Sequence, residues 1–170
     1  ASLPCAAVTA WNALYGATPL KAGDTVLTLG TGGVSVFAIQ LAHAAGARVI
    51  ATSSSDAKLE KARGLGASET INYRTHPDWE QEVRRLTDGA GVDHVVEVGG
   101  TGTLPRSLAP TRPGRHIRLV CRPAHRQPTA PLAPLGARCP ARGVAVGSRE
   151  WSAHMNRRPP PHAPTPGCAR

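Results

Sequence analysis

The chain has 170 residues, 41% of them hydrophobic, which is enough for the core of one domain and excludes a wholly disordered chain. No apolar run reaches the roughly 18 residues that a membrane-spanning helix needs. The net charge of +9 is uneven: residues 1–120 carry only +2, whereas residues 121–170 carry eight arginines and a single acid. The basicity therefore does not predict a nucleic-acid-binding domain.

The four cysteines, Cys5, Cys121, Cys139 and Cys168, form no C-x-x-C motif and have no zinc-finger spacing. We therefore expect free thiols in a cytoplasmic protein. The chain opens without an initiator methionine or a basic leader, which predicts a fragment that lacks a secretory signal.

Short β-rich runs alternate with segments of helical periodicity up to about residue 118. The predicted strands are 25–29, 48–52, 70–73, 93–98 and 116–120. The predicted helices between them begin near residues 34, 56, 77 and 104, and Asp56 is the expected N-cap of the second. This alternation predicts an α/β fold, a doubly wound parallel sheet with helices on both faces.

The composition changes after Val120. The last fifty residues hold ten prolines and eight arginines, with no sustained helical or strand period. Such a segment buries too little apolar surface to offset its ordering entropy. We therefore expect a domain over 1–120, a mostly irregular tail over 121–170, and a sheet that is incomplete at its C-terminal edge.

A glycine cluster lies directly between the first predicted strand and the first predicted helix. Gly30 allows a tight exit from the strand, and Gly32 allows a pyrophosphate to approach the backbone. Gly33 and Val34 open the helix, whose N–H groups and dipole then face the anion. Ser35 replaces the third glycine of the usual fingerprint. The alternatives are a glycine turn without a ligand and a methyltransferase, which would need an acidic residue after the second strand.

The residue that selects the cofactor is expected at the end of the second strand, where NAD-binding proteins place Asp or Glu. This sequence has Ser53 there, followed by Ser54 and, one helical turn on, Lys58. Hydroxyl donors and a cation suit a 2′-phosphate, so NADP is favoured and NAD stays possible. The serines can also be ordinary loop residues.

Together these features resemble the medium-chain dehydrogenase/reductase superfamily of zinc alcohol dehydrogenases and zinc-free quinone reductases. The matching stretches are 3–11, 20–26, the glycine turn, 44–51, 65–67, 71–74 and 91–99. The resemblance implies a Rossmann fold and hydride transfer between NADP(H) and a small carbonyl, alcohol or quinone. It implies that Thr9 lies against the nicotinamide, that Tyr73 lines the adenine or 2′-phosphate side, and that Val98 and Gly99 border the nicotinamide ribose.

Cys5 occupies the place of a catalytic zinc ligand in the zinc alcohol dehydrogenases. The zinc-free branch has small or apolar residues there, and Leu3-Pro4 resembles that branch. The remaining ligands would come from a domain that this chain lacks. We therefore name no metal ligand and no catalytic residue; the alternative role of Cys5 is a small buried thiol.

The resemblance implies a catalytic domain of more than a hundred residues before Ala1. It also fades after Ile117, returns at 142–150 and 155–157, and is lost again. Frame slips in GC-rich coding sequence would produce this pattern; the alternative is a genuine basic extension with non-specific phosphate affinity. The chain can thus be an inactive nucleotide-binding remnant. Relatives usually form homo-oligomers.

Overall fold

The computed structural model describes residues 3–16, 18–120, 139, 141–144 and 149–157. Within these ranges the strands are β1 (Thr25–Thr28), β2 (Arg48–Ser53), β3 (Glu69–Asn72), β4 (Val92–Glu97), β5 (Thr111–Leu119) and β6 (Ala141–Gly143). The helices are α1 (Leu3–Tyr15), α2 (Gly33–Ala44), α3 (Asp56–Gly64), α4 (Trp79–Leu86), the 3₁₀ turn η1 (Gly100–Gly102), α5 (Leu104–Leu108) and α7 (Arg149–Asn156). None of the helices in these ranges is both long and apolar enough to cross a membrane.

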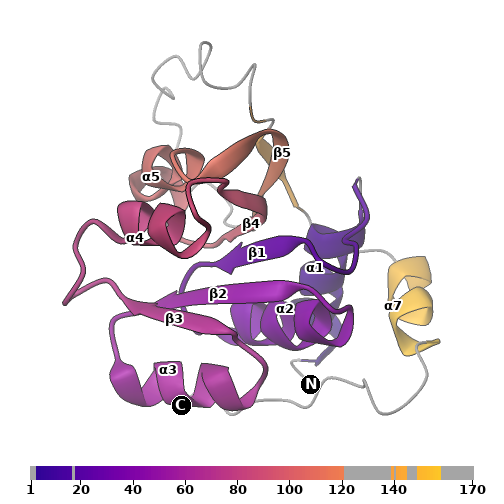
Figure 1. Ribbon diagram of the computed structural model, residues 1–170. Coiled ribbons are helices and arrows are strands. Elements are labelled where there is room, and N and C mark those ends of the chain that lie inside the picture. The colour runs from indigo at the N-terminus through magenta and orange to yellow at the C-terminus, as the bar shows by residue number, and fades with distance from the viewer. Residues whose placement is uncertain (1–2, 17, 121–138, 140, 145–148, 158–170) are drawn as a thin grey trace.

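The strands form one parallel sheet in the order β3-β2-β1-β4-β5-β6, which confirms the predicted fold class (Figure 1). The chain moves outward from β1 to β3 and then returns to the other side of β1 to form β4. The crevice at the carboxyl ends of β1 and β4 is therefore the switch point at which ligands bind in open α/β sheets.

Both faces of the sheet are covered, as the alternation of strands and helices predicts. One face packs against α1 and α2 through side chains that include Trp11, Phe37 and Ile39. The other packs against α4 and α5 through Trp79 and Leu104, among others. The buried β1 and β4 lie between these two layers, and their carboxyl ends are consequently held rigidly.

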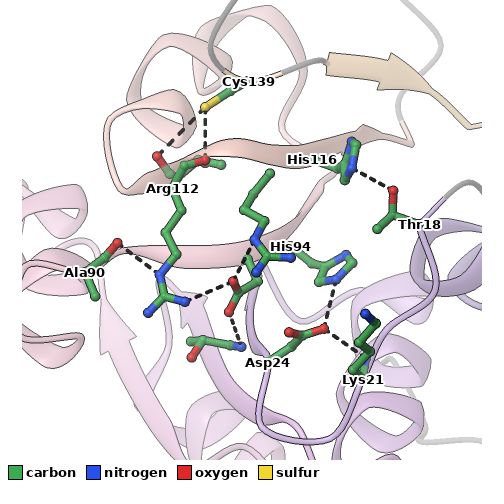
Figure 2. A network of polar contacts seen from close by, with 12 residues as sticks. Thr18, Lys21, Asp24, Ala90, His94, Arg112, His116 and Cys139 are labelled. Atoms are coloured by element: carbon green, nitrogen blue, oxygen red, sulfur yellow. Dashed lines mark hydrogen bonds and ion pairs between the residues drawn. The ribbon is translucent and has the colours of Figure 1, made fainter.

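A polar network joins the start of β1 to β4 and β5, at the edge of the sheet opposite those carboxyl ends (Figure 2). Asp93 Oδ2 accepts a hydrogen bond from the Thr25 N–H at 2.9 Å. Asp93 Oδ1 lies 3.1 Å from the guanidinium groups of both Arg112 and Arg115. Two cations thus compensate this carboxylate, which is only 2% exposed, and the network fixes the register between β1 and β4.

The start of α3 differs from the prediction. Ser55 is the N-cap, with extended backbone at φ −134° and ψ 121°, and Asp56 is the first helical residue. The Asp56 side chain accepts a hydrogen bond from Asn72 Nδ2 at 2.8 Å, so it ties α3 to the end of β3 instead of capping the helix.

The far edge of the sheet also differs from our expectation. Residues 141–143 pair in parallel with β5 as a sixth strand, and α7 packs against α1. These elements overlap the two stretches after residue 120, 142–150 and 155–157, that again resemble the superfamily. Backbone pairing of three residues needs no apolar pattern, and all three are exposed, which is why composition did not predict the strand. The remainder of the expected irregular tail lies outside the described residues.

Candidate nucleotide-binding site

The glycine turn leaves β1 in a conformation that its own hydrogen bonds fix. Gly30 has φ +69°, a left-handed conformation that favours glycine, and its N–H donates to Thr52 Oγ1 at 3.3 Å. The Ser35 hydroxyl, which is buried, donates to the Leu29 carbonyl at 2.8 Å. Ser35 thereby replaces the third glycine with a residue that is small enough to pack and that also joins α2 to β1.

Gly32 has a different reason to be glycine. Its φ is −77°, which any residue adopts, and a Cβ built there would meet no atom within 4 Å. Neither strain nor crowding inside the protein therefore requires glycine at this position. The free space instead lies where the N–H groups of the first turn of α2 face outward, which suits a phosphate.

An open pocket of about 220 Å³ lies over this helix start. Its walls are Gly32, Gly33, Val34, Ser35, Val98 and Val120. Four of these residues were predicted to bind the cofactor: Gly32, Gly33, Val34 and Val98. Ser35 was expected only to replace the third glycine of the turn. Val120, which was not predicted, follows β5 and reaches the site because the carboxyl ends of parallel strands share one end of the sheet. None of the described residues that line this pocket has a carboxylate, so these residues do not repel an anion by charge.

Ser53 ends β2 beside the glycine turn. It is 4% exposed, and its Oγ lies 3.2 Å from Thr31 Oγ1, with either hydroxyl able to donate. Ser54 next to it is half-buried, and Lys58 is exposed on α3. Thr31 was not among the predicted site residues. The middle residue of a Gly-x-Gly turn varies, so the sequence does not indicate a role for it until the structure shows its contact with Ser53 on the neighbouring strand.

Tyr73 follows β3 and is 43% exposed. Its N–H donates to the Ser53 carbonyl at 3.0 Å, so the residues proposed for the 2′-phosphate side do lie on adjacent strands. Val98 lies on the other side of β1, where its Cγ2 would be 3.9 Å from a Cβ at Gly30. Gly99 follows it at the exit of β4. The site residues thus flank the switch point on both sides.

Thr9 and Cys5 approach the turn from α1. A Cβ at Gly33 would lie 3.6 Å from Ala6 Cβ, so the start of α1 packs against the turn. Thr9 is buried, its hydroxyl donates to the Cys5 carbonyl at 2.7 Å, and it does not line the pocket. Cys5 is exposed. In the described part of the chain no three His, Cys, Asp or Glu side chains gather to hold a metal ion.

Comparison with known proteins agrees with this geometry. The family model of the zinc-binding dehydrogenases matches residues 33–157 and thus continues past the boundary expected at residue 120. A zinc-type alcohol dehydrogenase-like protein of Schizosaccharomyces pombe is 59% identical over 111 residues, which are 64% of this chain and 32% of that protein.

Two solved structures have the same fold. A putative alcohol dehydrogenase from Sinorhizobium meliloti superposes with a TM-score of 0.82 at 40% identity, covering 90% of this chain and 45% of that one. A quinone oxidoreductase of Pseudomonas syringae gives a TM-score of 0.77 at 28% identity, covering 88% and 48%. This chain therefore spans less than half the length of these relatives.

Proposed function

This chain belongs to the zinc-binding dehydrogenases of the medium-chain dehydrogenase/reductase superfamily, whose members use NAD or NADP, and we propose that it is the NADP(H)-binding part of such an oxidoreductase. The observation that carries the proposal is the open pocket over the start of α2, with paired hydroxyls of Thr31 and Ser53 where a carboxylate would select NAD.

The charges around the end of β2 support NADP over NAD. The 2′-phosphate would meet the hydroxyls of Thr31 and Ser53, with the Lys58 ammonium on the following helix. The acid nearest to Ser53 in sequence is Asp56, whose Oδ1 accepts a hydrogen bond from Asn72 Nδ2 at 2.8 Å. In an NAD-selective site a carboxylate in place of Ser53 would accept from the ribose 2′-OH and repel a phosphate.

The pyrophosphate is proposed to lie over Gly32 and Gly33, against the N–H groups of α2. The nicotinamide half would then continue toward Val98, Gly99 and Thr9. The bound dinucleotide would supply the hydride to a carbonyl or quinone, or accept it from an alcohol, while this chain's residues hold and orient the dinucleotide. The substrate of the whole protein, a small carbonyl, alcohol or quinone, is proposed from the resemblance to the alcohol and quinone oxidoreductases, and no residue here is assigned a catalytic role.

Titration of the purified chain with NADPH and with NADH, followed by nucleotide fluorescence or calorimetry, tests the proposal. We expect NADPH to bind in the micromolar range and at least about tenfold more tightly than NADH, since a charge-assisted hydrogen bond contributes on the order of 1.5–3 kcal/mol. A folded chain, verified by circular dichroism, that binds neither nucleotide contradicts the proposal. If NADPH and NADH bind equally tightly, the proposed dinucleotide site stands but the proposed preference for NADP is rejected.

A further inference from the structure

Glu97, the last residue of β4, directly precedes the pocket residue Val98, and its side chain is completely buried. A buried carboxylate is costly unless hydrogen bonds satisfy both oxygens. Glu97 was not among the predicted site residues, although it lies within a stretch that resembles the superfamily. A buried carboxylate next to a proposed ligand pocket therefore needs a structural or functional explanation.

Among the described residues, the hydrogen-bond partners of the Glu97 carboxylate come from the segment over residues 99–107 that follows it. Oε1 accepts from the Gly99 N–H at 2.7 Å and from Thr103 Oγ1 at 2.6 Å. Oε2 accepts from the Ser107 hydroxyl on α5. One carboxylate thus joins the end of β4, the turn over residues 98–103 and α5, through charge-assisted hydrogen bonds, which are the strong kind.

This arrangement fixes two walls of the pocket. Val98 lies between Glu97 and Gly99, so the hydrogen bond from the Gly99 N–H sets the direction in which Val98 leaves the strand. The Glu97 carbonyl also accepts from the Val120 N–H at 2.9 Å. Val98 and Val120 are the two wall residues that come from outside the glycine turn and α2.

Gly99 is required by the same arrangement. A Cβ there would lie 2.9 Å from Thr103 Cγ2, which is closer than side chains tolerate, and 3.1 Å from Glu97 Oε1, which is a tight contact. Its φ of −84° is ordinary, so the reason for glycine is crowding alone. The close approach of Thr103 to the carboxylate therefore depends on the missing side chain at position 99.

We propose that Glu97 is a positioning residue that holds the Val98 wall and thereby sets affinity for the nicotinamide half of the dinucleotide, without affecting the adenine half. The inference rests on the proposed function. The two halves are separable because the residues assigned to the 2′-phosphate side follow β2 and β3, whereas Val98 follows β4 on the other side of β1.

The test compares two probes on the same chain: NADPH, and adenosine 2′,5′-bisphosphate, which lacks the nicotinamide half. Glu97→Gln keeps the shape of the side chain but removes its charge and one acceptor. We expect it to weaken NADPH binding about tenfold, as the loss of a charge-assisted hydrogen bond implies. Binding of the bisphosphate should change by less than about twofold. Thr103→Val, which removes a single donor, should act in the same direction and provides the result if Glu97→Gln fails to fold.

Glu80→Gln is the matched control, because Glu80 on α4 accepts from Arg106 Nε of α5 at 2.9 Å and so supports α5 without touching the turn. It should lower thermal stability and leave both affinities unchanged. If the Glu97 variant loses both probes equally, or neither, or if Glu80→Gln shows the same selective loss, Glu97 has only a structural role and the inference is rejected. A wild-type chain that binds neither probe refutes the proposed function itself.

Discussion

The side-chain hydroxyls of Thr31 and Ser53 lie 3.2 Å apart and connect the glycine turn after β1 to the end of β2. One residue belongs to the proposed pyrophosphate turn and the other to the proposed cofactor selector. Because Ser53 is only 4% exposed, its hydroxyl oxygen is held next to that of Thr31. The two hydroxyls are thus already close together where they could donate hydrogen bonds to the ribose side of a nucleotide.

Ser53→Asp should reverse the cofactor preference. A carboxylate at this position accepts from a ribose 2′-OH and repels a 2′-phosphate, so NADPH binding should weaken by at least about tenfold while NADH binding tightens. Fluorescence titration with both nucleotides measures the change. Ser68→Asp is the control. Ser68 is exposed just before β3, at the amino ends of the strands, so this variant adds the same charge at the end of the sheet opposite the site. Unchanged selectivity in Ser53→Asp would show that Ser53 does not face the ribose.

Two alanine substitutions in the glycine turn should affect different properties: one should lower stability, and the other should lower NADPH affinity. Gly30→Ala places an L-residue at φ +69°, which should lower the free energy of unfolding by about 1–2 kcal/mol. Gly32→Ala meets no atom within 4 Å at an ordinary φ, so stability should be preserved. The same methyl would occupy the space proposed for the pyrophosphate, and NADPH affinity should therefore fall.

Urea unfolding and NADPH titration of both variants separate these effects. A stable Gly32→Ala chain that binds NADPH as wild type does would exclude the pyrophosphate from this turn. A Gly30→Ala chain as stable as wild type would contradict the assigned left-handed conformation.

The part of the candidate site that could be predicted consists of residues at a fixed distance in sequence from a recognisable strand. The glycine turn, Ser53 and Val98 each follow a strand that its own composition identifies, and a parallel sheet brings such positions to one edge. Thr31 and Glu97 were missed because their roles depend on which strands become neighbours and on a buried hydrogen-bond set. The Asp56 cap was wrong because the pairing with Asn72, sixteen residues later, outweighs a local preference.

Arg118 on β5 is a buried cation whose removal should stabilise the protein. It is 4% exposed, and its Nε and Nη2 have no hydrogen-bond partner in the described part of the chain. Burial lowers the pKa of the guanidinium, and Arg142, its register partner on β6, lowers it further. Arg118→Met keeps the volume and removes the desolvated charge, so the free energy of unfolding should rise by about 1–3 kcal/mol.

Urea denaturation measures this difference, and Arg74→Met serves as the control because Arg74, which follows β3, is exposed and does not act on the pKa of Arg118. That control should change stability by less than about 0.5 kcal/mol. A destabilised Arg118→Met chain would mean that the guanidinium is compensated in solution by a group outside the described residues.

His94 should make the protein sensitive to acid. It is 1% exposed, and its Nε2 lies 3.3 Å from Asp24 Oδ2, a contact that does not reach hydrogen-bond geometry (Figure 2). Burial lowers the pKa of His94, and the Asp24 carboxylate only partly opposes this. Burial and then Arg118 also lower the pKa of His116, whose Nε2 lies 2.6 Å from Thr18 Oγ1.

A histidine whose folded-state pKa lies below its ordinary value of 6.5 binds a proton more readily in the unfolded chain. The stability it contributes is therefore complete above about pH 6.5 and is lost progressively as the pH falls below that value. Thermal unfolding between pH 8 and 5.5 should show this loss. It should be smaller in His94→Gln, smallest when His116→Gln is added, and unchanged in His76→Gln, since His76 is exposed. A wild-type and a doubly substituted chain with the same pH slope would assign the acid sensitivity to the carboxylates.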